Sequence, residues 1–102
     1  MASLTPQGIS ALLARAGYAR SQRKPSMIKG LREHTDGFLV VRSDRCEGAV
    51  EVDHVTSTIN RHMPEERREK MLTAYTETLT AAGWTVEKHE DTFVDFLLVT
   101  TP

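Results

Sequence analysis

The sequence predicts an α+β domain in which two helices pack on one face of an antiparallel sheet of four to five strands. Two observations support this prediction. Apolar residues recur at steps of three and four in two segments, which is the period of an amphipathic helix, and β-branched and aromatic residues gather in short segments between polar turns. Each predicted helix has one apolar stripe to bury, so one sheet face suits both. The predicted order is helix, three strands, helix and two strands.

Length and composition indicate one globular domain spanning residues 1–102. Of its 102 residues, 39% are hydrophobic and 26% are charged, which is an ordinary globular composition. Apolar runs such as Phe96 to Val99 are far shorter than the roughly 20 residues of a membrane-spanning helix. The first residues show no signal-peptide pattern, so we expect a cytoplasmic protein without a membrane partner. Cys46 is the single cysteine, which excludes an internal disulfide.

The first helix is expected to begin after Thr5, whose hydroxyl can cap a free backbone donor, with Pro6 at the first helical position. Its apolar stripe consists of Ile9, Leu12, Leu13 and Ala16. Gly17 supplies the left-handed residue that ends a helix, and the aromatic Tyr18 just beyond it is expected to pack back on the last turn.

The N-terminal third of the chain is basic and the rest is acidic. Residues 1–32 hold six cations and no acid, whereas residues 33–102 hold seven cations and 14 acids. Such an asymmetry indicates a surface for an anionic partner, unless the two parts neutralise each other within the fold. The segment Ala19 to Pro25 has no hydrophobic period and is the best candidate for a mobile or partner-binding loop. The candidate partner-binding residues are Tyr18, Arg20, Arg23, Lys24, Lys29 and Arg32.

Three strands are predicted next. Segments 38–42 and 49–56 are rich in β-formers and flank a polar turn, which is typical of a hairpin. Asp36 and Gly37 form a second turn signal, so Met27 to Glu33 is expected to pair with the strand that begins at Phe38. A short helix capped by Ser26 is the alternative for that segment.

The second helix is expected to begin at Pro64, with Glu65 and Glu66 at the positive end of the helix dipole, and to end at Gly83. Its buried stripe consists of Met71, Leu72, Tyr75, Leu79 and Ala82. Segments 84–88 and 93–100 then form a last hairpin, whose second strand is too continuously apolar for an edge and is expected to lie centrally. An exposed edge beside it leaves a homodimer open, although Asp91 and Asp95 would oppose such pairing.

The motifs of nucleotide-binding loops, paired-histidine metal sites and paired-cysteine sites are absent from the sequence, so we expect neither an enzyme nor a cofactor. The best catalytic or metal-binding candidates are Asp53 and His54 on a predicted strand, with His62 and His34 in loops. Adjacent strand residues point to opposite faces, so Asp53 cannot orient the His54 ring. The alternative is a surface aspartate beside a histidine at a sheet edge.

Three segments, ISALLARAGYARS (9–21), TDGF (35–38) and LTAAGW (79–84), resemble small uncharacterised proteins of high-GC actinobacteria and their phages or mobile elements. The resemblance covers most of the chain and implies an accessory factor that acts by binding. It assigns no role to any residue.

These observations predict a non-enzymatic binding module that recognises a protein partner through the basic loop and the adjacent sheet edge. Nucleic-acid binding by residues 18–32 is the first alternative. Against it, Pro25 would break a recognition helix begun at Ser21, and Glu65 and Glu66 stand where a double-stranded RNA-binding domain needs cations. A small enzyme or metal protein that uses Asp53, His54 and His62 is the second.

Overall fold

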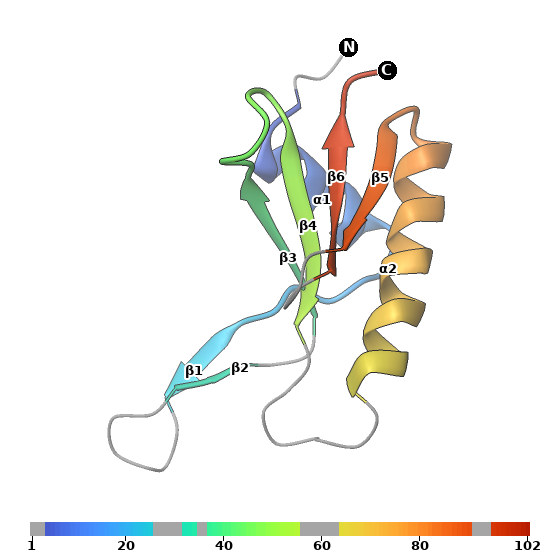
Figure 1. The fold of residues 1–102 in the computed structure, drawn as a ribbon. Helices are drawn as coiled ribbons and strands as arrows, with labels where there is room; N and C mark the ends of the chain where they lie inside the picture. The colour runs from blue at the N-terminus through green and yellow to red at the C-terminus, as the bar shows by residue number, and fades with distance from the viewer. Residues whose placement is uncertain (1–3, 26–31, 35–36, 56–63, 91–94) are drawn as a thin grey trace.

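The computed structural model describes residues 4–25, 32–34, 37–55, 64–90 and 95–102. Their elements, in chain order, are α1 (Pro6–Arg15), β1 (Arg23–Pro25), β2 (Arg32–His34), β3 (Gly37–Arg42), β4 (Val50–Val55), α2 (Pro64–Ala81), β5 (Thr85–Glu90) and β6 (Asp95–Thr100). Four strands form one antiparallel sheet in the order β3-β4-β6-β5, and β1 and β2 form a separate antiparallel pair (Figure 1).

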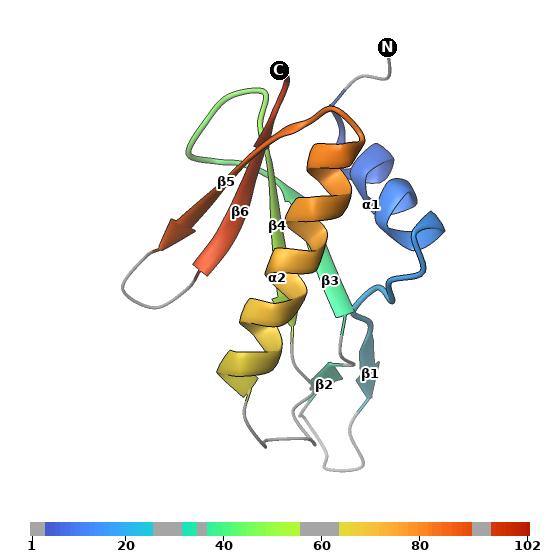
Figure 2. The ribbon, with the colours of Figure 1, turned by 90° about the vertical axis from the view of Figure 1, so that its right-hand side faces the viewer.

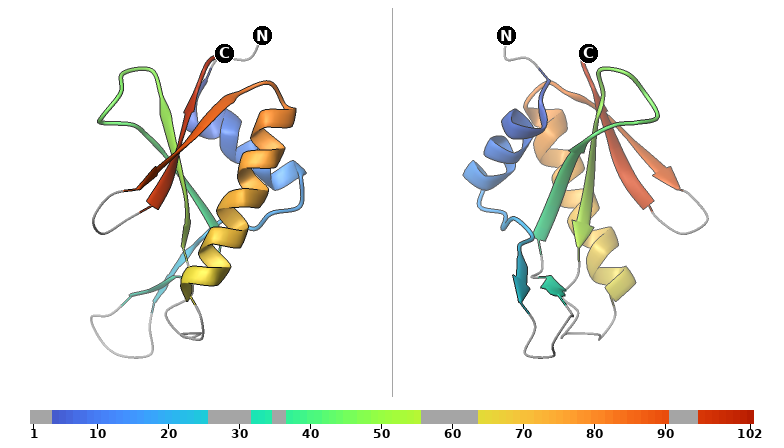
Figure 3. Two further views of the ribbon diagram at one scale, coloured as in Figure 1. Left: turned by 45° about the vertical axis from the view of Figure 1, so that its right-hand side comes forward. Right: turned by 90° about the vertical axis from the view of Figure 1, so that its left-hand side faces the viewer.

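Both helices lie on the same face of the four-stranded sheet, as the sequence predicts (Figures 2 and 3). Helix α1 packs on β3, and α2 packs on β4, β5 and β6 and also against α1. No described helix lies on the opposite face, and the β3–β4 turn leans over it (Figure 2). In the described parts of the chain, neither helix is long and apolar enough to cross a bilayer.

The predicted helix ends are confirmed. The Thr5 hydroxyl accepts a hydrogen bond from the Gly8 N–H at 3.0 Å. Gly17 has a φ of 100°, and the N–H of Tyr18 donates back to the Leu13 carbonyl at 3.1 Å. The second helix ends in the same way: its closing glycine has a φ of 97°, and the next N–H donates to the Leu79 carbonyl at 3.1 Å. Both aromatic residues that follow these glycines pack against the core.

The core lies between the helices and the two inner strands. Cross-strand pairing aligns Val50 with Val99 and Val52 with Leu97, so these four side chains face the helices together. Opposite them, the fully buried ring of Tyr75 from α2 fills the centre. The prediction that the C-terminal strand lies centrally is confirmed, because β6 pairs with β4 on one side and β5 on the other.

The predicted pairing of Met27 to Glu33 with β3 is wrong in its described part. Residues 32–34 pair with residues 23–25 instead, so part of the predicted loop Ala19 to Pro25 is a strand. Residues 26–31, including the Ser26 helix start, lie outside the described residues. The segment just before β1 takes the place beside β3: Arg20 forms a parallel bridge with Phe38. The Ser21 N–H donates to the Phe38 carbonyl at 3.0 Å, and the Phe38 N–H donates to the Ala19 carbonyl at 2.9 Å.

Gly37 makes this close approach possible. A methyl group added at its Cα would lie 2.6 Å from the Ala19 carbonyl oxygen and 2.5 Å from the Arg20 carbonyl carbon, and would collide with the Ser21 backbone nitrogen. These are backbone atoms, which cannot turn aside as a flexible side chain can. Any side chain at position 37 would therefore push segment 19–21 away from β3.

We expect Gly37→Ala to lower the free energy of unfolding by about 1–3 kcal/mol, the usual cost of forcing extra atoms into a packed site. Urea denaturation measures this loss. The matched control is Gly8→Ala in the exposed part of α1, which should leave stability unchanged or raise it by up to ~1 kcal/mol, because alanine favours a helix. Wild-type stability of Gly37→Ala would contradict the assigned contact.

Candidate functional site

Strand β3 forms one edge of the sheet, and part of its backbone faces outward. Backbone groups of an antiparallel strand alternate between the two neighbouring sides. Both groups of Phe38 bond to segment 19–21, and the Ser43 N–H donates to the Ala49 carbonyl on the β4 side at 3.0 Å. The N–H and C=O groups of Val40 and Arg42 therefore point away from β4. No described strand lies beside them there.

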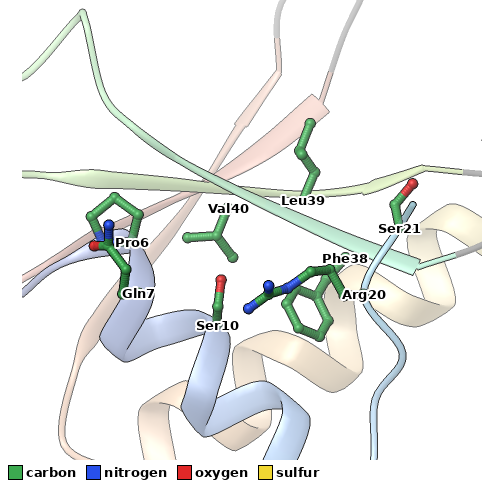
Figure 4. A pocket seen from close by; sticks show the side chains of 8 residues that line it. All are labelled: Pro6, Gln7, Ser10, Arg20, Ser21, Phe38, Leu39 and Val40. Atoms are coloured by element: carbon green, nitrogen blue, oxygen red, sulfur yellow. The ribbon is translucent and has the colours of Figure 1, made fainter. Parts of the chain in front are cut away.

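A groove of about 290 Å³ runs along this edge. It is lined by Pro6, Gln7 and Ser10 from α1, by Phe38, Leu39 and Val40 from β3, and by Arg20 and Ser21. Figure 4 shows the Arg20 side chain pointing into the groove and the Val40 side chain directed toward α1, whereas Leu39 points to the other face of the sheet. Helix α1 thus forms the floor of the groove. Strand β3, whose backbone groups at Val40 and Arg42 face outward, forms its wall.

Positive charge lies at both ends of this edge. Arg20 is exposed and has no acidic neighbour among the groove-lining residues. At the other end, the exposed Arg42 lines a second hollow of about 220 Å³, which also contains Glu47. Pro6 lines both hollows, so they are neighbours along β3. The edge therefore attracts a segment with negative charge, most strongly at the Arg20 end, where no acid lines the groove.

The two edges of the sheet differ in chemistry. Strand β5 carries Glu87, Lys88 and His89 in succession, and such charges are a common protection against unwanted strand pairing. Strand β3 instead exposes Leu39 by 45% and Val41 by 44% on the open face. An edge strand whose residues 38–41 carry no charge and which exposes two aliphatic side chains invites pairing with another segment.

On the sheet face opposite the helices, the surface around β6 is covered by side chains, whereas the surface around β3 is exposed. The guanidinium carbon of Arg45, from the β3–β4 turn, lies 4.9 Å from the centre of the Phe96 ring. The His89 ring stacks on the same phenyl ring with centroids 5.4 Å apart. Phe96 is consequently only 5% exposed. The exposed apolar surface of this face is thereby concentrated beside the groove.

The structure separates the predicted partner-binding residues. Tyr18 packs edge-on against Tyr75 with ring centroids 5.0 Å apart, and its hydroxyl lies 3.3 Å from the Thr78 hydroxyl. We therefore leave Tyr18 out of the candidate site. Arg20 lines the groove.

Three other predicted partner-binding residues belong to the small β1–β2 sheet. Arg23 and Lys24 lie on β1 and Arg32 lies on β2, where Lys24 pairs with Glu33. Lys29 lies outside the described residues. The predicted basic surface thus falls on two separate elements, the groove and the β1–β2 pair.

His54 is buried, with 3% of its surface exposed, on a part of β4 that pairs with β3 and lies beyond the last β4–β6 pair at Val52. Its Nδ1 lies 2.7 Å from the Tyr75 hydroxyl oxygen. Asp53 is held separately: its carboxylate accepts from Arg68 Nη2 at 2.7 Å and Nε at 3.0 Å, and from the His54 backbone N–H at 2.7 Å. The two side chains therefore have different partners, Tyr75 for His54 and Arg68 for Asp53, and both contacts connect β4 to α2.

The sequence also offered two other histidines as catalytic or metal-binding candidates. His34 lies on β2, and His62 is outside the described residues. The part of the chain that the structure describes contains no cluster of three or more potential metal ligands.

Sequence reasoning missed most of the groove. Pro6, Gln7 and Ser10 attracted attention only as helix residues, because nothing in their order shows which strand α1 packs beside. The uncharged run from Phe38 to Val41 was the available signal, since edge strands usually carry charge. Comparison of the chain with protein-family models, curated proteins and solved structures found no match.

The contact between His54 and Tyr75 predicts a stability effect. We expect Tyr75→Phe to lower the free energy of unfolding by roughly 1–3 kcal/mol, because a buried polar ring nitrogen loses its hydrogen-bond partner. The matched control is Tyr18→Phe, which removes a half-buried hydroxyl and should cost less than about 1 kcal/mol. Urea denaturation compares the two, and an equal or larger loss in Tyr18→Phe would contradict the structural role of the pair.

Proposed function

We propose that this chain is a non-enzymatic, cytoplasmic binding module that takes an extended segment of a protein partner as an additional strand on β3. The observation that supports this most is the outward-facing backbone of Val40 and Arg42 beside a groove floored by α1. Strand addition at an exposed sheet edge is a recurrent mode of peptide recognition, in which main-chain hydrogen bonds provide affinity and adjacent pockets provide specificity. The resemblance to actinobacterial and phage proteins suits an accessory factor of this kind.

The groove offers a defined set of contacts to such a segment. Val40 and Arg42 each present one N–H and one C=O, and each hydrogen bond contributes about 0.5–1.5 kcal/mol net. Alternate side chains of the segment would enter the groove beside Pro6 and Ser10 or extend the apolar row of Leu39 and Val41. Association costs at least about 4 kcal/mol in lost freedom, so binding should be weak and transient.

Nucleic-acid binding by residues 18–32 is the alternative, and the basic residues Arg23, Lys24 and Arg32 favour it. The described geometry supports it less well than peptide binding. Single-strand binders stack bases on exposed aromatic rings, and Tyr18, the aromatic residue of this segment, packs on Tyr75. Tight binding of a short single-stranded oligonucleotide at low salt, lost as salt rises, would favour this alternative over the proposal.

Val40→Pro tests strand addition. Proline lacks the N–H that the added strand needs, yet it is tolerated where that N–H faces a free edge. We expect the variant to fold and to lose binding of a fluorescein-labelled hexapeptide of alternating valine and threonine, measured by fluorescence anisotropy. The matched control Val40→Ala keeps the N–H and should retain binding. Equal binding by both variants, with both folded by circular dichroism, would rule out pairing at Val40.

A further inference from the structure

Resting on the proposed function, we propose that the segment bound by β3 is the C-terminus of a partner chain, antiparallel to β3 with its terminal carboxylate at Arg20. One end of the groove is blocked, the direction of the added strand follows from that of β3, and the residues that line the groove at the blocked end include Arg20 but no acid.

The groove is closed at one end by the chain itself. Segment 19–21 occupies the β3 edge at Phe38 through two backbone hydrogen bonds, and Gly37 allows it to lie directly against the strand. A partner strand that pairs with Arg42 and Val40 therefore meets Arg20 and Ser21 in its path. It must either leave the sheet or end there, and a chain terminus fits this position without a turn.

Strand direction decides which terminus arrives at the block. Strand β3 runs from the closed end at Gly37 to the open end at Arg42. An antiparallel neighbour runs the opposite way, so its C-terminal end reaches Arg20. Antiparallel pairs are slightly more stable per residue than parallel pairs. The residue opposite Val40 is then the second to last, because the next residue lies opposite Leu39 and its terminal carboxylate reaches the level of Phe38, where segment 19–21 begins to occupy the edge.

Charge at the closed end suits a carboxylate. The Arg20 side chain points into the groove (Figure 4), and the residues that line the groove include no acid. Ser10, which is 8% exposed, lines the floor of the groove and offers a hydroxyl donor. A terminal carboxylate would supply the negative charge that the groove lacks, and its hydrogen bonds to a guanidinium are stronger than those between neutral groups.

The second-to-last side chain has a defined environment. A partner residue directly opposite Val40 points to the same sheet face as Val40, which is the face of α1. It therefore packs between Val40 and Pro6, in a groove of about 290 Å³ shared with the backbone of the strand. This space favours one aliphatic side chain such as valine. The expected ligand is a C-terminus with an aliphatic residue before its last position.

The test uses the hexapeptide Val-Thr-Val-Thr-Val-Thr in two forms, with a free C-terminal carboxylate and with a C-terminal amide. Fluorescence anisotropy on the full chain should show about tenfold tighter binding of the free acid, a factor expected for one charge-assisted hydrogen bond at a partly exposed site. In Arg20→Gln the two peptides should bind equally, at the affinity of the amide. Arg15→Gln, in the last turn of α1 and outside the groove, should keep the tenfold difference.

The outcomes separate the two proposals. Equal binding of both peptides by the wild type, with binding lost in Val40→Pro, would overturn the C-terminal assignment and leave strand addition in place. Failure of both peptides to bind the wild type, at concentrations where a weak complex is measurable, would overturn both. A tenfold preference that persists in Arg20→Gln would also overturn the role of Arg20.

Discussion

The contact between segment 19–21 and the start of β3 determines the rest of the proposed site. Gly37 has no side chain, so the backbone of segment 19–21 can approach the strand closely enough for Ala19 and Ser21 to form one hydrogen bond each with Phe38. That contact provides hydrogen-bond partners for the backbone N–H and C=O of Phe38 but does not extend to Val40 and Arg42. It also places the Arg20 side chain so that it points into the groove (Figure 4). If segment 19–21 paired with more of β3, it would cover the edge completely. Without this pairing, Arg20 would have no fixed position beside the groove.

Some polar side chains of this fold have partners inside the protein, whereas the Arg20 side chain faces the groove. His54 and Asp53 bind Tyr75 and Arg68, and both contacts join β4 to α2. Beyond Val52, β4 no longer pairs with β6, so these contacts hold the strand where the sheet opens. Arg20, in contrast, makes its structural contact through its backbone and leaves its charged group facing the groove. Polar groups with internal partners stabilise the fold, and the charge directed outward is the one suited to a ligand.

Local chemistry made much of the fold predictable. Thr5 and Pro6 start a helix, Gly17 ends it, and a continuous apolar run marks an inner strand, because each effect involves neighbours in the sequence. Pairing between distant segments was predicted less well. The β1–β2 pair lacks hydrophobic alternation, and the burial of His54 depends on a tyrosine from another element. The groove combines α1, β3 and segment 19–21, whose proximity the sequence does not show. Of the residues that line it, only Arg20 was predicted to bind a partner.

We infer that β3 accepts an added strand beside Arg20. The most direct measurement is amide hydrogen exchange by NMR with and without the valine–threonine hexapeptide. We expect exchange to slow at Val40 and Arg42, whose N–H groups face outward, and to stay unchanged at Leu39, whose N–H faces β4. Unchanged exchange at Val40 with bound peptide, or protection confined to β5, would contradict it.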